Sequence, residues 1–126
     1  MGDPVPLDSK DNDIRDYLER IKRLIQQHWV FPCVKDRQTG VCEYKSTELM
    51  VEFGILKHGP LQYVEIRRAS PYDIYDESAV VAVKLASPFP PVPAAMMARM
   101  GNGSTGASIT ARFVYHYETG ITNLLR

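Results

Sequence analysis

The stretch from Asp76 to Pro93 constrains the fold of this chain more than any other. It sets an amphipathic run, with the small residues Ala79, Ala82 and Ala86 on one side, directly before a cluster of prolines. Aspartate is a common helix N-cap, and proline lacks the amide hydrogen that would continue a helix. The pattern predicts a helix that begins at Asp76, ends at the prolines and packs closely on a sheet.

A second helix is expected upstream. Apolar residues recur at steps of three and four from Ile14 to Trp29, and charged residues occupy the positions between them. Asp13 is the expected N-cap, and Pro32 prevents the helix from continuing.

Three strands are expected from a two-residue alternation of apolar and polar side chains. They lie at residues 49–56, 63–67 and 109–117, and a turn at His58-Gly59-Pro60 joins the first two. Since a sheet with one wet face needs a cover for its apolar side, the sequence predicts a two-layer α+β fold. A three-stranded antiparallel sheet is covered by two helices, in the order α-β-β-α-β.

The domain organisation is expected to be simple. A chain of 126 residues fits one domain with its own core. Residues 1–13 mix prolines with polar residues and predict a flexible tether, residues 14–118 form the domain, and residues 119–126 form a C-terminal tail.

Composition and motifs argue against several classes of function. Fifteen basic and fifteen acidic residues cancel, so no net field attracts nucleic acid. No metal-ligand spacing links His28, His58 and His116, and no nucleophile motif is present, so we expect no metal, no cofactor and no enzyme. The alternative is a small enzyme or ligand binder, which would show a deep pocket lined by one of these histidines.

Two further motifs can be interpreted either as binding sites or as ordinary structural segments. Residues 101–106 match the GxGxxG pattern of dinucleotide sites, but a strand follows them where that site needs a helix, so a surface loop is favoured. Residues 88–93 contain PxxP and either form a polyproline ligand or a stiff strap across the sheet. The strap is favoured because Phe89 and Val92 can seal the core.

The two cysteines, Cys33 and Cys42, can face each other across a small hairpin that turns over residues 36–39. Lys35 would then oppose Gly40. Directly opposite residues can approach closely enough for a disulfide, although two reduced thiols in the cytosol would give the same pattern.

The last predicted strand is the remaining candidate for function. An edge strand presents unpaired N–H and C=O groups that can accept a strand from another chain. Alternatively, residues 109–117 form a core strand whose edge is covered by the tail at 121–126. The residues alone leave both interpretations open.

The chain resembles the C-terminal domain family of TonB and TolA over roughly residues 14–118. The resemblance rests on the helix and prolines of Asp76–Pro93, on the alternating last strand and on an upstream set, namely Tyr17, Ile21, Ile25, Trp29 and Pro32. It implies a periplasmic domain of a TonB-like energy transducer, with an inner-membrane anchor before residue 1. Such a domain performs no covalent chemistry; it transmits force from a proton-driven motor.

The resemblance also implies partners. An ExbB/ExbD- or TolQ/TolR-like motor would act through the missing N-terminal part, and a peptide of an outer-membrane receptor or Tol-Pal protein would bind by β-strand addition. No nucleic acid or small-molecule substrate is implied. The partner-binding residues would be Ile109, Thr110, Ala111, Arg112, Phe113, Val114, Tyr115, His116 and Tyr117.

Two roles within the family stay open. The long first helix and Phe31-Pro32, in place of a Tyr-Pro pair, favour a TolA-like domain of the Tol-Pal system or of another envelope machine. The cysteines, which precede the first long strand, do not match TolA. A periplasmic location would favour a disulfide between Cys33 and Cys42.

Overall fold

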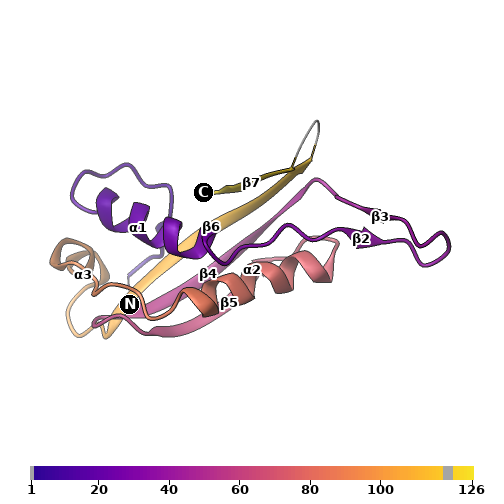
Figure 1. Ribbon diagram of the computed structural model, residues 1–126. Helices are drawn as coiled ribbons and strands as arrows, with labels where there is room; N and C mark the ends of the chain where they lie inside the picture. The colour runs from indigo at the N-terminus through magenta and orange to yellow at the C-terminus, as the bar shows by residue number, and fades with distance from the viewer. Residues whose placement is uncertain (1, 118–120) are drawn as a thin grey trace.

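The computed structural model describes residues 2–117 and 121–126, with the side chains of all but 121–123. The fold is α+β, as the sequence predicts (Figure 1). Its elements in chain order are β1 (Val5–Pro6), α1 (Arg15–Gln26), β2 (Val34–Lys35), β3 (Cys42–Glu43), β4 (Thr47–Leu56), β5 (Leu61–Arg68), α2 (Asp73–Ala86), α3 (Ala94–Met100), β6 (Gly106–Tyr117) and β7 (Ile121–Leu125). No helix of the described residues is long and apolar enough to cross a membrane.

The main sheet is built around β4 and β6. Its order is β1-β6-β4-β5, and β7 also pairs with β6. β4 runs antiparallel to both β5 and β6, while β1 is parallel to β6. Helices α1 and α2 lie on one face of this sheet, and the other face is open (Figure 1). The buried positions of β4 that meet the helices are Leu49, Val51, Phe53 and Ile55.

The predicted order α-β-β-α-β is incomplete, because the sheet has five strands and the fold has a third helix. The predicted tether at residues 1–13 contains β1, where Val5 is buried and Leu7 donates its amide to the carbonyl oxygen of Thr110 at 2.8 Å. A two-residue strand is too short to show an alternating pattern, so the periodicity did not predict it. The predicted boundary between domain and tail, at residues 118 and 119, lies outside the described residues.

Both helix starts differ from the predicted ones. Helix α1 begins after Ile14 without a side-chain cap, and Asp13 instead pairs with Arg99 at 2.8 Å. Helix α2 begins at Asp73, three residues earlier than expected. Asp76 accepts a hydrogen bond from the amide of Ser70 at 2.9 Å and thereby closes the loop before the helix.

An aromatic layer joins helices and sheet in the core. The indole N–H of Trp29 donates to the hydroxyl of Tyr115 at 2.8 Å, and that hydroxyl donates to the carbonyl oxygen of Tyr75 at 3.0 Å. The rings of Tyr75 and Tyr115 stack with centroids 4.4 Å apart. Burial raises the pKa of Tyr115, so its hydroxyl stays protonated and keeps donating.

The proline segment is a strap on the body, as the favoured interpretation predicted. Phe89 and Val92 are buried, and their amides donate to the carbonyl oxygens of Gly59 and Lys57, each at 2.9 Å. A side chain at Gly59 would collide with the backbone of Phe89, so this turn requires glycine. The hydroxyl of Tyr17 donates to the carbonyl oxygen of Pro90 at 2.9 Å, and burial raises the pKa of Tyr17 to about 12.

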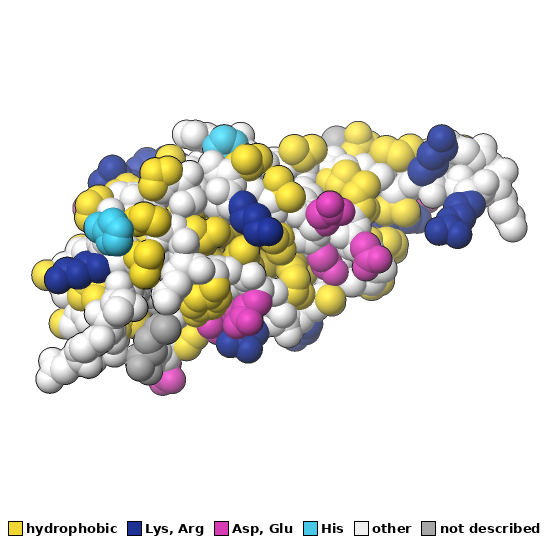
Figure 2. All heavy atoms as spheres, turned by 90° about the horizontal axis from the view of Figure 1, so that it is seen from below, with side chains coloured by type: hydrophobic (Ala, Val, Ile, Leu, Met, Phe, Trp, Pro, Cys, Tyr) yellow, Lys and Arg dark blue, Asp and Glu magenta, His cyan; other side chains and the backbone are white. Residues whose placement is uncertain are grey.

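The two remaining surface segments lie at opposite ends of the domain. The glycine-rich residues 101–106 connect α3 to β6, so no helix follows them and the dinucleotide-binding context is absent. At the other end β2 and β3 form a narrow arm that projects from the body and carries basic side chains (Figures 1 and 2).

The arm is closed by a disulfide between Cys33 and Cys42, whose Cα atoms lie 5.4 Å apart, which confirms the predicted bridge. The predicted register is wrong, because Lys35 opposes Cys42 rather than Gly40. The carboxylate of Asp36 accepts hydrogen bonds from the backbone amides of Gln38 and Thr39, so the turn lies closer to Gly40 than predicted. These hydrogen bonds also lower the pKa of Asp36.

Candidate functional site: the outer edge of strand β6

Strand β6 has neighbours on both sides, so it is not the free edge strand that the three-stranded arrangement implied. Its inner edge pairs with β4 along ten residues, from Thr47 to Leu56. Its outer edge pairs with β1 at Ile109 and Thr110 and with β7 from Phe113 to Tyr117. The alternative interpretation, in which the tail covers this edge, therefore describes the resting arrangement.

The predicted partner-binding residues divide between the two faces of β6. Ile109, Ala111, Phe113 and Tyr115 are buried against the helices, and the residues between them lie on the open face of the sheet. Pairs in an antiparallel ladder alternate between hydrogen-bonded and non-hydrogen-bonded, so successive amides of β6 point to opposite edges. Arg112 exchanges both backbone hydrogen bonds with Arg126, at 2.6 and 2.9 Å. The amides of Val114 and His116 consequently point to the outer edge as well.

Of the side chains of β7 that the structure describes, one is buried against β6. Leu125 is buried opposite Phe113, whereas Leu124 lies opposite Val114 and is partly exposed. The paired length of β7 is five residues, half that of β4. Because β7 pairs with β6 over five residues and β4 over ten, we expect β7 to separate from β6 at a lower cost than β4.

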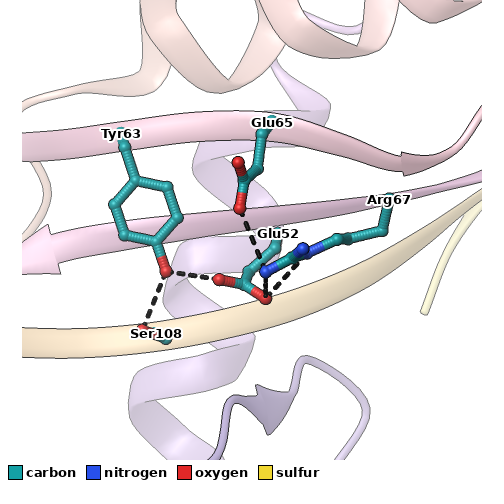
Figure 3. Close-up of polar contacts among 5 residues, drawn as sticks. All are labelled: Glu52, Tyr63, Glu65, Arg67 and Ser108. Carbon is teal, nitrogen blue, oxygen red and sulfur yellow. Dashed lines mark hydrogen bonds and ion pairs between the residues drawn. The ribbon is translucent and has the colours of Figure 1, made fainter. Parts of the chain in front are cut away.

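On the open face a polar brace, defined as Glu52, Tyr63, Arg67 and Ser108, ties β5, β4 and β6 together (Figure 3). The hydroxyl of Tyr63 donates to Glu52 at 2.6 Å and is hydrogen-bonded to Ser108 at 2.9 Å. Arg67 donates from Nε and Nη2 to one oxygen of Glu52, at 3.0 and 2.8 Å. The brace therefore fixes β6 to the body from the side of its inner edge.

Two local features make the brace possible. A side chain at Gly54 would collide with the ring of Tyr63, so glycine lets that ring cross β4 and reach Ser108. Burial by itself raises the pKa of Glu52, but the hydrogen bonds from Tyr63 and Arg67 outweigh it, and the pKa is lowered overall. The carboxylate is consequently charged at neutral pH and acts as the acceptor at the centre of the brace.

The structure does not bring the three histidines together. His58 lies in the β4–β5 turn, two residues after Leu56, which pairs with Gly106 at the start of β6. His116 lies ten residues further along β6, roughly 30 Å away at the rise of a strand. His28 borders a separate surface hollow of about 290 Å³ beside α2. Among the described residues no group of three or more His, Cys, Asp or Glu side chains could hold a metal ion.

The sequence contains only partial signals for β1, β7 and the polar brace, which the periodicity did not predict. The apolar residues Leu124 and Leu125 in the tail and Val5 and Leu7 near the start were visible signals of burial, but each run is short. Brace residues Glu52 and Tyr63 alternate with core residues as any open-face residues do. Their convergence depends on the strand register, which the sequence pattern does not give.

Comparison with known proteins places this geometry in a family. The family described as TonB C terminal matches residues 14–102, which is more than half of the chain and stops just before β6. The solution structure of the Helicobacter pylori TonB C-terminal domain superposes with a TM-score of 0.57 at 16% sequence identity, and the match covers 82% of each chain. No curated protein matches. On the family match, this chain belongs to the TonB C-terminal domain family.

Proposed function

We propose that this domain is the periplasmic end of a TonB-like energy transducer and that it binds an outer-membrane partner by β-strand addition to the outer edge of β6. The partner segment would take the place of β7 and pair with the amides of Arg112, Val114 and His116. The observation that carries the proposal is the unequal pairing of β6. A ten-residue ladder and the polar brace hold its inner edge, and short strands cover its outer edge.

This arrangement suits the transmission of force. A segment paired along β6 would be pulled nearly parallel to its own axis, so its main-chain hydrogen bonds would be loaded together rather than one after another. The load would then pass through β6 to β4 and to the aromatic layer of Trp29, Tyr75 and Tyr115. In the proposed transducer, an inner-membrane motor would supply the force through a part of the protein that precedes residue 1.

The test is a titration of the ¹⁵N-labelled domain with synthetic ten-residue peptides from the N-terminal segments of outer-membrane receptors encoded in the same genome. We expect a binding peptide to shift the outward amides of Arg112, Val114 and His116 most. The inward amides of Ala111, Phe113 and Tyr115 should keep their slow hydrogen exchange. Scrambled peptides of equal composition are the matched control.

A variant tests the replacement of β7 directly. Leu125→Ser weakens the anchor of β7 and should tighten peptide binding, because less resting structure has to be displaced. Circular dichroism checks that the variant stays folded. Shifts concentrated on β5 or α2, or unchanged affinity in Leu125→Ser, would contradict the proposal. If receptor peptides give no shifts, peptides from Tol-Pal proteins test the TolA-like role.

A further inference from the structure

A small notch opens on the open face of the sheet where β1 and β7 meet along β6. It has a volume of about 130 Å³. Asp8 provides the one carboxylate among its lining residues, which are Pro6, Asp8, Met50, Thr110, Arg112 and Arg126. A space of this size admits a carboxylate group but is too small for a nucleotide or a sugar.

Two arginines face each other across this notch. Arg112 and Arg126 exchange backbone hydrogen bonds, so they are direct cross-strand neighbours, and both side chains line the same hollow. Like charges directly opposite each other on one face of a sheet destabilise the pairing. The resting contact between β6 and β7 therefore contains an unfavourable charge pair at its end.

The guanidinium of Arg112 is also incompletely satisfied. Among the described residues its Nε is buried without a hydrogen-bond partner. Glu48 forms an ion pair with Arg112, but its carboxylate oxygen lies 3.7 Å from Nε, which is too far for a hydrogen bond. A buried donor without an acceptor is costly, so an anion that reached Nε would gain free energy.

We propose that the notch selects the partner strand by its charge: the residue that takes the position of Arg126, opposite Arg112, is an aspartate or a glutamate. This inference rests on the proposed strand addition. A carboxylate there accepts hydrogen bonds from the planar guanidinium fork and replaces a like-charged pair by an opposite-charged one. The neighbouring residue, in the position of Leu125, is apolar because it faces Phe113 in the core.

The first experiment needs no partner, because Arg126→Glu places the carboxylate in the notch on β7 itself. Hydrogen exchange of the Arg112 amide should slow about fivefold, the upper range of a cross-strand charge pair. The Nε–H resonance of Arg112 should shift. Leu124→Glu is the matched control, since it puts the same carboxylate on the same strand and face but opposite Val114. If both variants behave alike, the inference is overturned.

Charge removal gives an independent check. Arg112→Gln removes the cation without placing a second carboxylate beside Glu48, so adding Arg126→Glu to this variant should no longer slow exchange at residue 112. Thermal unfolding of each variant checks that the body stays folded. If Arg126→Glu slows exchange equally with Arg112 and with Gln at position 112, the charge mechanism is contradicted.

The second experiment uses pairs of peptides that differ only at the position opposite Arg112, with glutamate or glutamine. The acidic peptide should bind the native domain several-fold more tightly, and Arg112→Glu should reverse the order. Peptides that shift the outward amides without an acid preference would overturn this inference and leave strand addition intact. If no peptide reaches β6, both proposals fail.

Discussion

The two edges of β6 differ in what holds them, although they belong to one strand. The inner edge pairs with the whole of β4, whose residues Leu49, Val51, Phe53 and Ile55 are buried in the core. The polar brace also holds this side of β6. The outer edge is shared by a two-residue and a five-residue strand. Under the proposed function, one strand is a fixed part of the scaffold on one side and an exchangeable surface on the other, because local stability follows buried contacts rather than hydrogen bonds alone.

The largest effect is expected from breaking the inner edge. Phe53→Ala removes a fully buried ring that stacks near Phe89, and it should lower the free energy of unfolding by about 3–5 kcal/mol. Urea denaturation followed by circular dichroism measures the loss. Ile74→Ala on the exposed face of α2 is the control and should cost well under 1 kcal/mol, within the usual range for surface changes. A loss below about 2 kcal/mol for Phe53→Ala would mean that the site collapses around the missing ring.

A smaller loss is expected from the brace. Glu52→Gln removes the charged acceptor shared by Tyr63 and Arg67 and should cost about 1–3 kcal/mol at neutral pH. The lowered pKa of Glu52 means that its ionised form is favoured by folding, so its contribution is present above the ordinary value of 4.5 and is lost as the pH falls through the lowered folded pKa.

Denaturation curves between pH 3 and pH 7 test this prediction. The native domain and Glu52→Gln should converge in stability as the pH falls. Glu65→Gln, on an exposed carboxylate that also lies near Arg67, is the matched control and should stay close to the native domain throughout. A difference between native and Glu52→Gln that does not depend on pH would show that the charge of Glu52 is not what the brace uses.

The outer edge should respond locally rather than globally. Leu125→Ala removes the buried anchor of β7, and hydrogen exchange at Arg112 and Val114 should speed up by about 5- to 30-fold, which corresponds to one or two kcal/mol. The global unfolding free energy should change by less than about 1 kcal/mol, because β7 opens before the body unfolds. Equal losses in both measurements would show that β7 and the core form one cooperative unit.

The same contrast explains what the sequence could predict. The helices and the three long strands have strong periodicity, and the alternation picks out the buried apolar residues Leu49 to Ile55 of β4 and Ile109 to Tyr115 of β6. Tyr117, which shares that alternation, is exposed, and Glu52 and Ser108 on the opposite face are buried. The α+β layers follow from them. Strands β1 and β7 are too short for a period to emerge, so the covered outer edge of β6 was visible only as an alternative.

Contacts between residues that are far apart in the sequence were less predictable than the helices and strands themselves. Asp13 and Asp76 have the residue type of helix caps, yet Arg99 and the amide of Ser70 engage them instead. The notch between Arg112 and Arg126 depends on the register of β7, because a shift of one residue would turn Arg126 to the other face. A propensity describes a residue and its near neighbours, and these pairings are set by the packing of the whole sheet.

The smallest global effect is expected from the disulfide. A disulfide that closes a loop of about ten residues reduces the entropy of the unfolded chain and stabilises the fold by roughly 2–3 kcal/mol. The full amount applies only if the loop unfolds together with the rest of the domain. The arm projects from the body, and its described ring contacts, from Tyr44 to Phe31 and Tyr117, lie outside the bridged loop. The double variant Cys33→Ser with Cys42→Ser should therefore open locally and lower the global unfolding free energy by less than about 1 kcal/mol.

Urea curves of the native domain with and without a reducing agent provide the matched comparison. A global loss near 3 kcal/mol would show that the arm unfolds with the core, and the contrast between fixed and exchangeable parts would then apply to the outer edge of β6 alone.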